Sequence, residues 1–249
     1  MVINDFNIFL SGCYLGQERI GTASHSGDYG DLIASMSLYK RLGGGNLVLY
    51  PTATRHRMDF IHMCIVAPLL EAQDYIDSVE FNEEPLGLNL DNWRHHYQPG
   101  LNITDLNFHW LDLPLPERDE PWLTVDPNPK AEVIFCRSQR YHGSFPWRDA
   151  LDKYHGKSCF VGLPHEHREF ESRFGQIPYY ETDDLLEAAR IIQGARLVLV
   201  NQTCLYWISE GLKQTICLEA AGGSRHRNCY WERPGFTYGT SQSMILPEV

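Results

Sequence analysis

Short apolar runs alternate along this chain with segments whose apolar residues recur at helical spacing. Residues 19–24 and 46–51 are apolar runs of strand length. Between them, Leu32, Met36 and Tyr39 follow the i, i+4, i+7 pattern of an amphipathic helix. This order of strand, helix and strand predicts a βαβ unit, whose two strands are parallel.

The pattern weakens after this unit. Residues 60–75 predict a second helix, which Pro68 should divide or kink, and residues 76–81 predict a weak strand. Residues 83–107 show no clear period, so only an irregular segment is expected there. The following stretch, residues 111–130, holds five prolines in twenty residues and reads as a linker.

The alternation of strands and helices then restarts. Four further strands are predicted at residues 132–137, 158–163, 196–200 and 215–219. Four helices are predicted at residues 146–154, 165–174, 185–193 and 203–212, the third capped by Asp183 or Asp184. Residues 222–249 show no reliable period, so the strand at 215–219 is expected to be the last.

Strands with little internal alternation, separated by amphipathic helices, are typical of parallel sheets covered on both faces. The fold class predicted is therefore α/β, with two Rossmann-like lobes and a cleft between them. The proline-rich linker places the lobes at residues 1–128 and 129–249.

Composition narrows the class of protein. The apolar content of 43% is that of a folded chain, and the formal charge of −11 argues against a general nucleic-acid coat, which needs a basic face. The seven cysteines are scattered and several lie in apolar runs, as buried free thiols do, which indicates a reducing compartment. No apolar run approaches the roughly 20 residues that span a bilayer, and no secretory signal is evident. A cytoplasmic protein without a membrane span is expected.

The stretch SHSGDYGD, residues 24–31, follows the first predicted strand and leads into the first helix. Loops at the carboxyl ends of parallel strands form the ligand crevice of α/β folds. Gly27 and Gly30 match neither the dinucleotide fingerprint nor the P-loop, and an acidic pair would repel phosphate. Asp28 and Asp31 therefore suggest a hydroxyl or amine ligand, although Asp31 could simply cap the helix and Asp28 could complete a turn.

Two segments together resemble heptosyltransferase-like glycosyltransferases. GDYGDLIASMSLYKRLGGGNLVLYP, residues 27–51, resembles their amino-terminal signature, in which Gly-Asp opens a helix that an apolar strand follows. ETDDLLEAARIIQGARLVLVNQTCLYWISEGLKQTICLEA, residues 181–220, is similar to the second half of the family's pattern, and the two occur in the family's order.

The resemblance implies a compact GT-B arrangement, with an acceptor lobe followed by a donor lobe, no obligatory metal and no cofactor. The nucleotide-sugar serves as co-substrate, and the acceptor carries a free hydroxyl on a glycan, a lipid-linked sugar or a modified nucleic acid. Asp31 matches the family's general base, and Asp28 would tune it or bind acceptor hydroxyls. Direct displacement would invert the anomeric centre. The chain is short for two full lobes, so activity could depend on a homodimer.

The departing nucleoside diphosphate needs groups that neutralise negative charge. Arg137 and Arg140 follow a predicted strand, and Asn201, Gln202 and Thr203 open a predicted helix, so these five residues are candidates for holding the donor. Glu219, at the end of another strand, could hold a ribose hydroxyl. Each has a plain structural alternative: a salt bridge or solvated loop for the arginines, a helix cap for Thr203, and the edge of a sheet for Glu219.

The donor half departs from the family where donor contacts are expected. Heptosyltransferase-like proteins usually carry an Asp-Ser/Thr-Gly turn followed closely by His, whereas this chain has Gln202, Thr203 and Cys204. Two alternatives therefore stay open. One is a viral DNA-modifying glycosyltransferase acting on hydroxymethylated bases, with a nucleic-acid track of Arg55, His56, Arg57, Arg225 and Arg227. The other is a catalytically silent nucleotide-binding scaffold of the same fold.

Two further signals are set aside. The sequence His165-Glu166-His167 is not the HExxH zinc motif and has no further ligand at a standard spacing. Cys136 and Cys204 lie near predicted loops, but neither has an evident histidine partner, so both are expected to be packing residues.

Overall fold

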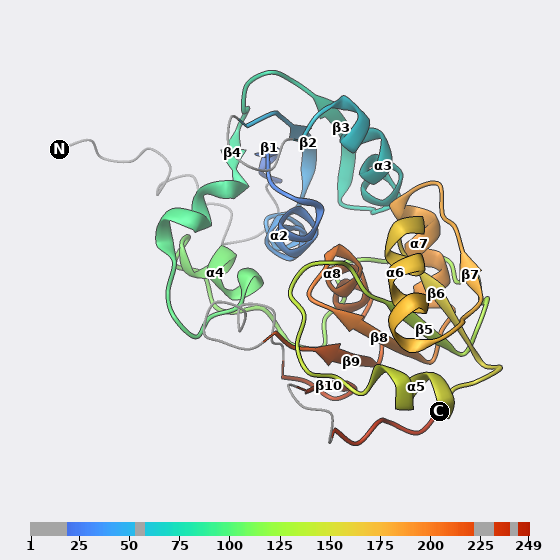
Figure 1. The fold of residues 1–249 in the computed structure, drawn as a ribbon. Helices are drawn as coiled ribbons and strands as arrows, with labels where there is room; N and C mark the ends of the chain where they lie inside the picture. Colours follow the sequence, from blue (N-terminus) through green and yellow to red (C-terminus); the bar gives the residue numbers. More distant parts are fainter. Residues whose placement is uncertain (1–18, 53–57, 222–231, 240–243) are drawn as a thin grey trace.

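The described part of the chain forms two separate sheets of parallel strands (Figure 1). The computed structural model describes residues 19–52, 58–221, 232–239 and 244–249. The sheets belong to an amino-terminal and a carboxy-terminal lobe, as the sequence predicts. The exact boundary between residues 128 and 129 stays a prediction. Arg55, His56, Arg57, Arg225 and Arg227, the expected nucleic-acid track, lie outside the described residues.

The first sheet has the strand order β3-β2-β1-β4. Its strands are β1 (Gly21–His25), β2 (Gly45–Leu49), β3 (Ile76–Phe81) and β4 (Leu88–Asn89). The chain adds β2 and β3 on one side of β1 and then returns to place β4 on the other side. The order of strands thus reverses between β1 and β4.

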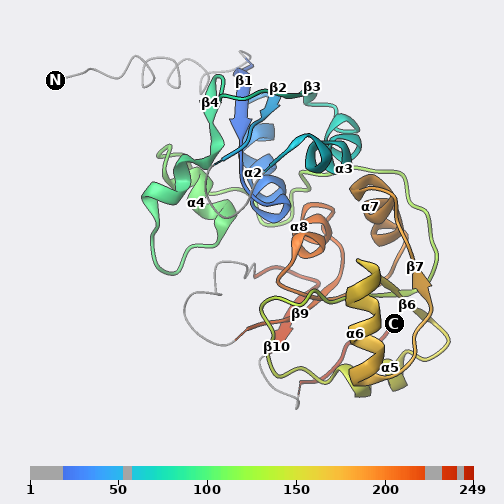
Figure 2. The ribbon, with the colours of Figure 1, turned by 45° about the horizontal axis from the view of Figure 1, so that its top comes forward.

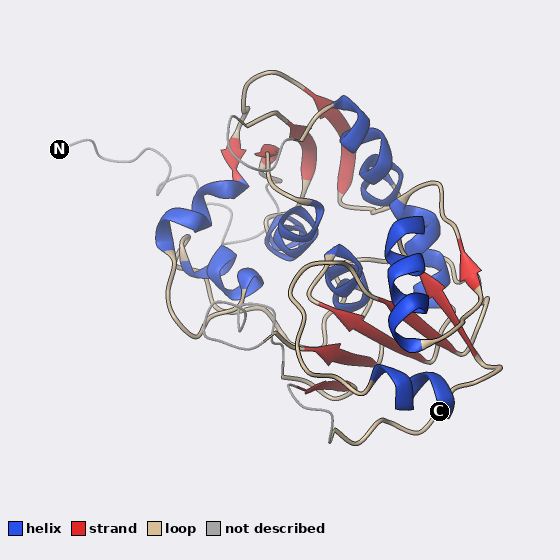
Figure 3. Cartoon of the chain, viewed as in Figure 1, coloured by secondary structure: helices blue, strands red, loops and turns tan. Residues whose placement is uncertain are grey.

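Helices pack around this sheet, as Figure 3 shows. They are α2 (Tyr29–Arg41), α3 (Phe60–Glu71), the 3-10 helix η1 (Leu90–His96) and α4 (Ile103–His109). Pro68 lies inside α3 and does not divide it. The expectation of an irregular segment over residues 83–107 is wrong, because β4, η1 and α4 all lie there.

The second sheet has the order β10-β9-β8-β5-β6-β7. Its strands are β5 (Val133–Cys136), β6 (Ser158–Val161), β7 (Tyr179–Tyr180), β8 (Leu197–Asn201), β9 (Ile216–Glu219) and β10 (Phe236–Gly239). Here too the order reverses, between β5 and β8. The expectation that residues 215–219 form the last strand is wrong, because β10 pairs with β9.

The helices of the second lobe begin and end close to their predicted limits. They are α5 (Trp147–Lys153), α6 (Pro164–Phe174), α7 (Leu185–Gln193) and α8 (Cys204–Gly211). The predicted cap of α7 is confirmed at Asp184, whose side chain accepts a hydrogen bond from the Glu187 N–H. A polar residue at this position satisfies one of the free N–H groups of the first helical turn.

The proline-rich linker joins the lobes and contributes to their common core. The Trp122 indole donates a 2.9 Å hydrogen bond to the Ile33 carbonyl of α2, and the Trp122 and Leu123 N–H groups donate to the Gly211 carbonyl of α8. Ile33, Trp122 and the α8 residue Trp207 belong to one cluster of buried apolar side chains. Figure 2 shows α8 lying between α2 and the second sheet. The lobes are therefore packed directly on each other.

Among the described residues, every helix is too short or too polar to cross a bilayer.

Candidate active site

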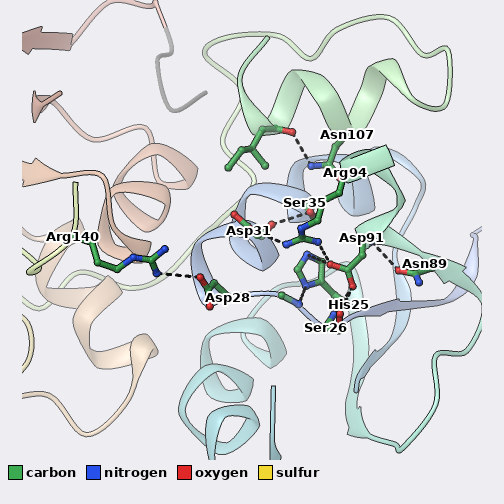
Figure 4. Close-up of polar contacts among 12 residues, drawn as sticks. His25, Ser26, Asp28, Asp31, Ser35, Asn89, Asp91, Arg94, Asn107 and Arg140 are labelled. Atoms are coloured by element: carbon green, nitrogen blue, oxygen red, sulfur yellow. Dashed lines mark hydrogen bonds and ion pairs between the residues drawn. The ribbon is translucent and has the colours of Figure 1, made fainter. Parts of the chain in front are cut away.

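The two sheets present their switch points to each other. In an open α/β sheet, ligands bind beyond the carboxyl ends of the strands where the strand order reverses. In the first sheet this position lies beyond β1 and β4, and in the second it lies beyond β5 and β8. Arg140, which follows β5, donates a 3.2 Å hydrogen bond to the Asp28 carboxylate, which follows β1 (Figure 4). One ion pair therefore links the two switch points.

Asp28 and Asp31 take different places at the start of α2. Asp28 occupies the cap position, but its side chain makes no capping hydrogen bond, and Arg140 binds it instead. Asp31 lies in the first helical turn. The alternative in which Asp31 is the cap of this helix is therefore wrong. A carboxylate in the first turn also interacts favourably with the helix dipole.

Asp31 belongs to a cluster of three charged residues, together with Arg94 and Asp91. The Arg94 guanidinium donates from Nη2 to Asp31 Oδ2 at 2.5 Å and from Nη1 to Asp91 Oδ1. Asp91 and Arg94 both belong to η1, which directly follows β4. The second Asp31 oxygen, Oδ1, makes no hydrogen bond among the described residues. One oxygen of the predicted base is thus fixed, whereas the other has no hydrogen-bond partner in the part of the chain that the structure describes.

Asp91 is bound on its other side by the loop and strand ends around it. Its Oδ2 accepts hydrogen bonds of 2.7 Å from both the N–H and the hydroxyl of Ser26, and one of 3.2 Å from the Tyr50 hydroxyl. Asn89 in turn donates to the Tyr50 oxygen at 2.9 Å. The residues that follow β1, β2 and β4 are therefore joined through a single carboxylate.

His25 ends β1 and is fully buried beside this cluster. Its Nδ1 accepts a 3.0 Å hydrogen bond from the Gly27 N–H, which assigns the ring proton to Nε2. Nε2 lies 3.7 Å from Asp91 Oδ1 and makes no hydrogen bond to any described residue. Burial lowers the pKa of His25, although Asp91 works in the opposite direction. The ring is therefore neutral at neutral pH.

The loop after β5 carries Arg140 and is held by Asn201, the last residue of β8. The Asn201 amide donates to the Ser138 carbonyl at 3.1 Å, to the Ser138 hydroxyl at 3.2 Å and to the Arg140 carbonyl at 2.6 Å. Its oxygen accepts from the Ser138 N–H at 2.9 Å. Asn201 is fully buried, and its hydrogen bonds hold this loop against the end of β8.

Arg137 and Glu219, both predicted to hold the donor, bind each other. Arg137 Nε lies 2.9 Å from Glu219 Oε2, and the two side chains are 6% and 0% exposed. Glu219 also accepts a 3.1 Å hydrogen bond from the Gly143 N–H. The pair ties the end of β9 to the loop after β5. Its assignment to donor binding stays a prediction.

Gln202 and Thr203 lie between β8 and α8. The Gln202 side chain accepts a 3.1 Å hydrogen bond from the Ala221 N–H and is buried. Thr203 has the extended backbone of a cap residue, but its side chain makes no capping hydrogen bond. A side chain added at Gly30 of α2 would approach Trp207 Cδ1 within 3.1 Å and the Cys204 Cα within 3.7 Å. The amino-terminal turns of α2 and α8 therefore lie against each other.

The residues set aside from the sequence have structural surroundings. Burial raises the pKa of the Cys204 thiol to about 11 and the pKa of the Cys136 thiol well above its ordinary value, so neither is a thiolate at neutral pH. Glu166 accepts a 2.9 Å hydrogen bond from the Leu163 N–H at the start of α6. Within the described ranges, no three His, Cys, Asp or Glu side chains gather as a metal site would require.

Sequence reasoning missed Asp91, Arg94, Tyr50 and His25. Asp91 and Arg94 follow a strand of only two residues and lie on a 3-10 helix, so neither period 2 nor period 3.6 could reveal them. One local signal was present in the sequence, because an asparagine such as Asn89 commonly caps the start of a helix. In the structure its side chain accepts a 2.9 Å hydrogen bond from the Asp91 N–H.

Comparison with known proteins bears on the fold. No protein-family model and no curated protein sequence matches the chain. E. coli heptosyltransferase WaaC with ADP superposes with a TM-score of 0.52 at 11% identity, over 79% of this chain and 86% of that one. The glycosyl transferase family 9 protein from Veillonella parvula DSM 2008 gives a TM-score of 0.52 at 10% identity, over 80% of each chain.

The iron-containing dodecameric glycosyltransferase TibC from enterotoxigenic E. coli H10407 also aligns, with a TM-score of 0.46 at 12% identity over 81% of this chain. The present chain spans 58% of the length of TibC. At such identities, the likeness to WaaC and to the Veillonella parvula protein shows the fold alone. These two comparisons confirm the predicted α/β architecture of two Rossmann-like lobes and its resemblance to heptosyltransferase-like proteins at that level.

Proposed function

We propose that this protein is a glycosyltransferase that moves a sugar from a nucleotide-sugar to an acceptor hydroxyl. The observation that supports this most is the Asp28–Arg140 ion pair, which joins an acidic loop at one switch point to a basic loop at the other. A transfer between two substrates needs an acceptor side and a donor side that face each other. The likeness in fold to WaaC, a heptosyltransferase with ADP bound, agrees with that arrangement.

Asp31 is the proposed general base. An acceptor hydroxyl is a weak nucleophile at neutral pH, and removal of its proton during attack accelerates transfer by about 10²- to 10⁴-fold. Asp31 Oδ2 is held by Arg94 and Oδ1 makes no hydrogen bond among the described residues, so Oδ1 would take the proton. The acceptor oxygen bonds to the anomeric carbon as the bond from that carbon to the phosphate oxygen breaks. Direct displacement of this kind inverts the anomeric centre.

The donor side would stabilise the departing nucleoside diphosphate. The Arg140 side chain is 54% exposed, and its planar guanidinium suits paired phosphate oxygens. The amino-terminal end of α8, at Thr203, offers the positive end of a helix dipole. Asn201 would act indirectly, by fixing the loop that carries Arg140. The Arg137–Glu219 pair would also act indirectly, by tying this loop to the end of β9. Asp28 would bind acceptor hydroxyls once Arg140 has left it to bind the diphosphate.

The experiment begins with a thermal-shift screen of UDP-, GDP- and ADP-linked sugars. Each sugar-nucleotide that raises the Tm is then incubated with glycans bearing free hydroxyls or with hydroxymethylated DNA, and the released nucleoside diphosphate is measured. We expect Asp31→Asn to lower the rate of transfer by about 10²- to 10⁴-fold while leaving the thermal shift unchanged.

Two outcomes would contradict the proposal. Binding of a nucleotide-sugar without transfer to any acceptor would favour the catalytically silent scaffold. Near wild-type transfer by Asp31→Asn would remove the base assignment. Transfer only to hydroxymethylated DNA, falling steeply with added salt, would identify the DNA-modifying alternative.

A further inference from the structure

We infer that Arg94 and Asp91 are positioning residues, which fix the orientation of the Asp31 carboxylate so that its Oδ1 faces an incoming acceptor. The inference deepens the proposed function and rests on it for the reaction itself. It rests on the bonding around Asp91, on the two-sided contact of Arg94 and on the room that Gly27 leaves for the guanidinium.

Asp91 is the fixed point of the arrangement. Three donors from outside η1 converge on its Oδ2: the Ser26 N–H, the Ser26 hydroxyl and the Tyr50 hydroxyl. They come from the ends of β1 and β2, which are neighbouring strands of the sheet. The Asp91 side chain is only 13% exposed. A carboxylate bound from three directions and largely buried cannot change its rotamer without breaking several hydrogen bonds.

Arg94 transmits this fixed position to Asp31. Its planar guanidinium binds Asp91 through Nη1 and Asp31 Oδ2 through Nη2. Because the guanidinium is rigid, the position of the Asp31 carboxylate is fixed relative to that of Asp91. The guanidinium carbon also lies 4.8 Å from the centre of the Trp93 ring. A point charge such as that of lysine could not reproduce this forked contact.

Gly27 leaves the space that Arg94 needs. A Cβ atom at residue 27 would come within 2.4 Å of Arg94 Nη2, the nitrogen that binds Asp31. It would also come within 2.9 Å of the His25 ring. Any side chain at this position would therefore push the guanidinium away from Asp31. The absence of a side chain at Gly27 thus allows Arg94 to reach Asp31.

Asp31 needs such support because it lies at the start of a helix and is 27% exposed. An aspartate in the first turn of a helix has several accessible rotamers. Only an orientation with one oxygen toward the acceptor is productive, and a displacement of about 1 Å at a reacting group can cost about 10²-fold in rate. Arg94 removes this freedom by holding Oδ2 while leaving Oδ1 open.

The test compares Arg94→Ala, Arg94→Lys and Asp91→Asn with a matched control, Arg118→Ala. Arg118 pairs with Asp105 of the same lobe through both terminal guanidinium nitrogens, and its side chain is 35% exposed, against 34% for Arg94. We expect the kcat of Arg94→Ala to fall by about 10²-fold with little change in KM for the acceptor, and Arg94→Lys to recover only part of this loss. Arg118→Ala should keep a kcat within about twofold of the wild type.

Crystal structures of the wild type and of Arg94→Ala, without substrate, supply a readout that does not depend on activity. We expect one Asp31 conformer in the wild type and several in the variant. An unchanged kcat in Arg94→Ala, or a rise in KM alone, would overturn the inference, since the latter would make Arg94 an acceptor-binding residue. If the wild type transfers no sugar, the proposed function fails, and an Asp31 that keeps its conformer in Arg94→Ala overturns the positioning role as well.

Discussion

Asp91 is a largely buried carboxylate whose neighbours keep it charged. Burial by itself would raise its pKa, but nearby Arg94, His25 when it is protonated in acid, and the hydrogen bonds from Ser26 outweigh burial and lower the pKa from 3.8 to about 2. The same neighbours therefore make folding depend on pH, because the unfolded chain holds this proton more tightly than the folded protein does.

The sign of that dependence follows from the lowered pKa. The contribution of Asp91 to the free energy of unfolding is fully present above about pH 4 and is lost as pH falls toward 2, and its full size is about 2 kcal/mol. We expect the stability advantage of the wild type over Asp91→Asn to shrink by about 1 kcal/mol between pH 6 and pH 3. Urea unfolding of both proteins across this range measures it.

Asp105→Asn provides the comparison, since Asp105 of α4 pairs with Arg118 and not with Arg94. This variant reports the effect on stability of removing the charge of an aspartate that pairs with a different arginine of the same lobe. A gap between the wild type and Asp91→Asn that stays constant from pH 6 to pH 3 would contradict the role assigned to the neighbours of Asp91.

At the scale of elements, the loops at the carboxyl ends of β1, β5 and β8 were predictable, whereas the one after β4 was not. β5 and β8 are fully buried and read as continuous apolar runs bounded by polar residues. β4 has two residues and pairs only with β1, so its position depends on tertiary contacts. The sequence therefore located Asp28, Arg140 and Asn201 at the right edges but could not locate Asp91.

The loop after β5 illustrates how one element fixes another. Asn201→Ala would remove four hydrogen bonds between β8 and residues 138–140 and leave backbone groups of the loop without partners. We expect a loss of about 2–3 kcal/mol in the free energy of unfolding. Urea denaturation followed by circular dichroism measures this loss.

Asn107→Ala is the matched control for this prediction. Asn107 is equally buried, but among the described residues its amide donates one hydrogen bond, of 2.9 Å, to the Ile103 carbonyl within α4. The control should lose only about 1 kcal/mol. Equal losses in the two variants would mean that the cost comes from removing a buried amide, and not from releasing the loop.

At the scale of the whole molecule, the lobes and their order follow from the sequence pattern, but their contact does not. Arg94 meets Asp31 across 63 residues of sequence, and Arg140 meets Asp28 across 112. No periodicity links residues so far apart. The pairing of Arg137 with Glu219 was equally hidden, because it depends on β5, β8 and β9 being neighbours in the sheet.

The linker gives the two lobes a common core. Trp122 is 2% exposed and hydrogen-bonds to both α2 and α8, while its carbonyl accepts a 2.7 Å bond from the Tyr75 hydroxyl. A side chain at Gly211 would come within 2.8 Å of Leu123, so α8 packs closely on the linker. Core residues of both lobes belong to one cluster, which favours cooperative unfolding over separate melting of each lobe.

We therefore expect a single calorimetric transition for the wild type, and a loss of about 3–5 kcal/mol in the free energy of unfolding for Trp122→Ala, because a large cavity would open between the lobes. Trp110→Ala, at the partly buried end of α4, is the control and should lose less while keeping one transition. Two resolved transitions in the wild type would show that the lobes fold independently. The approach of Asp28 to Arg140 would then depend on surface contacts between two independently folded lobes, and not on the shared core around Trp122.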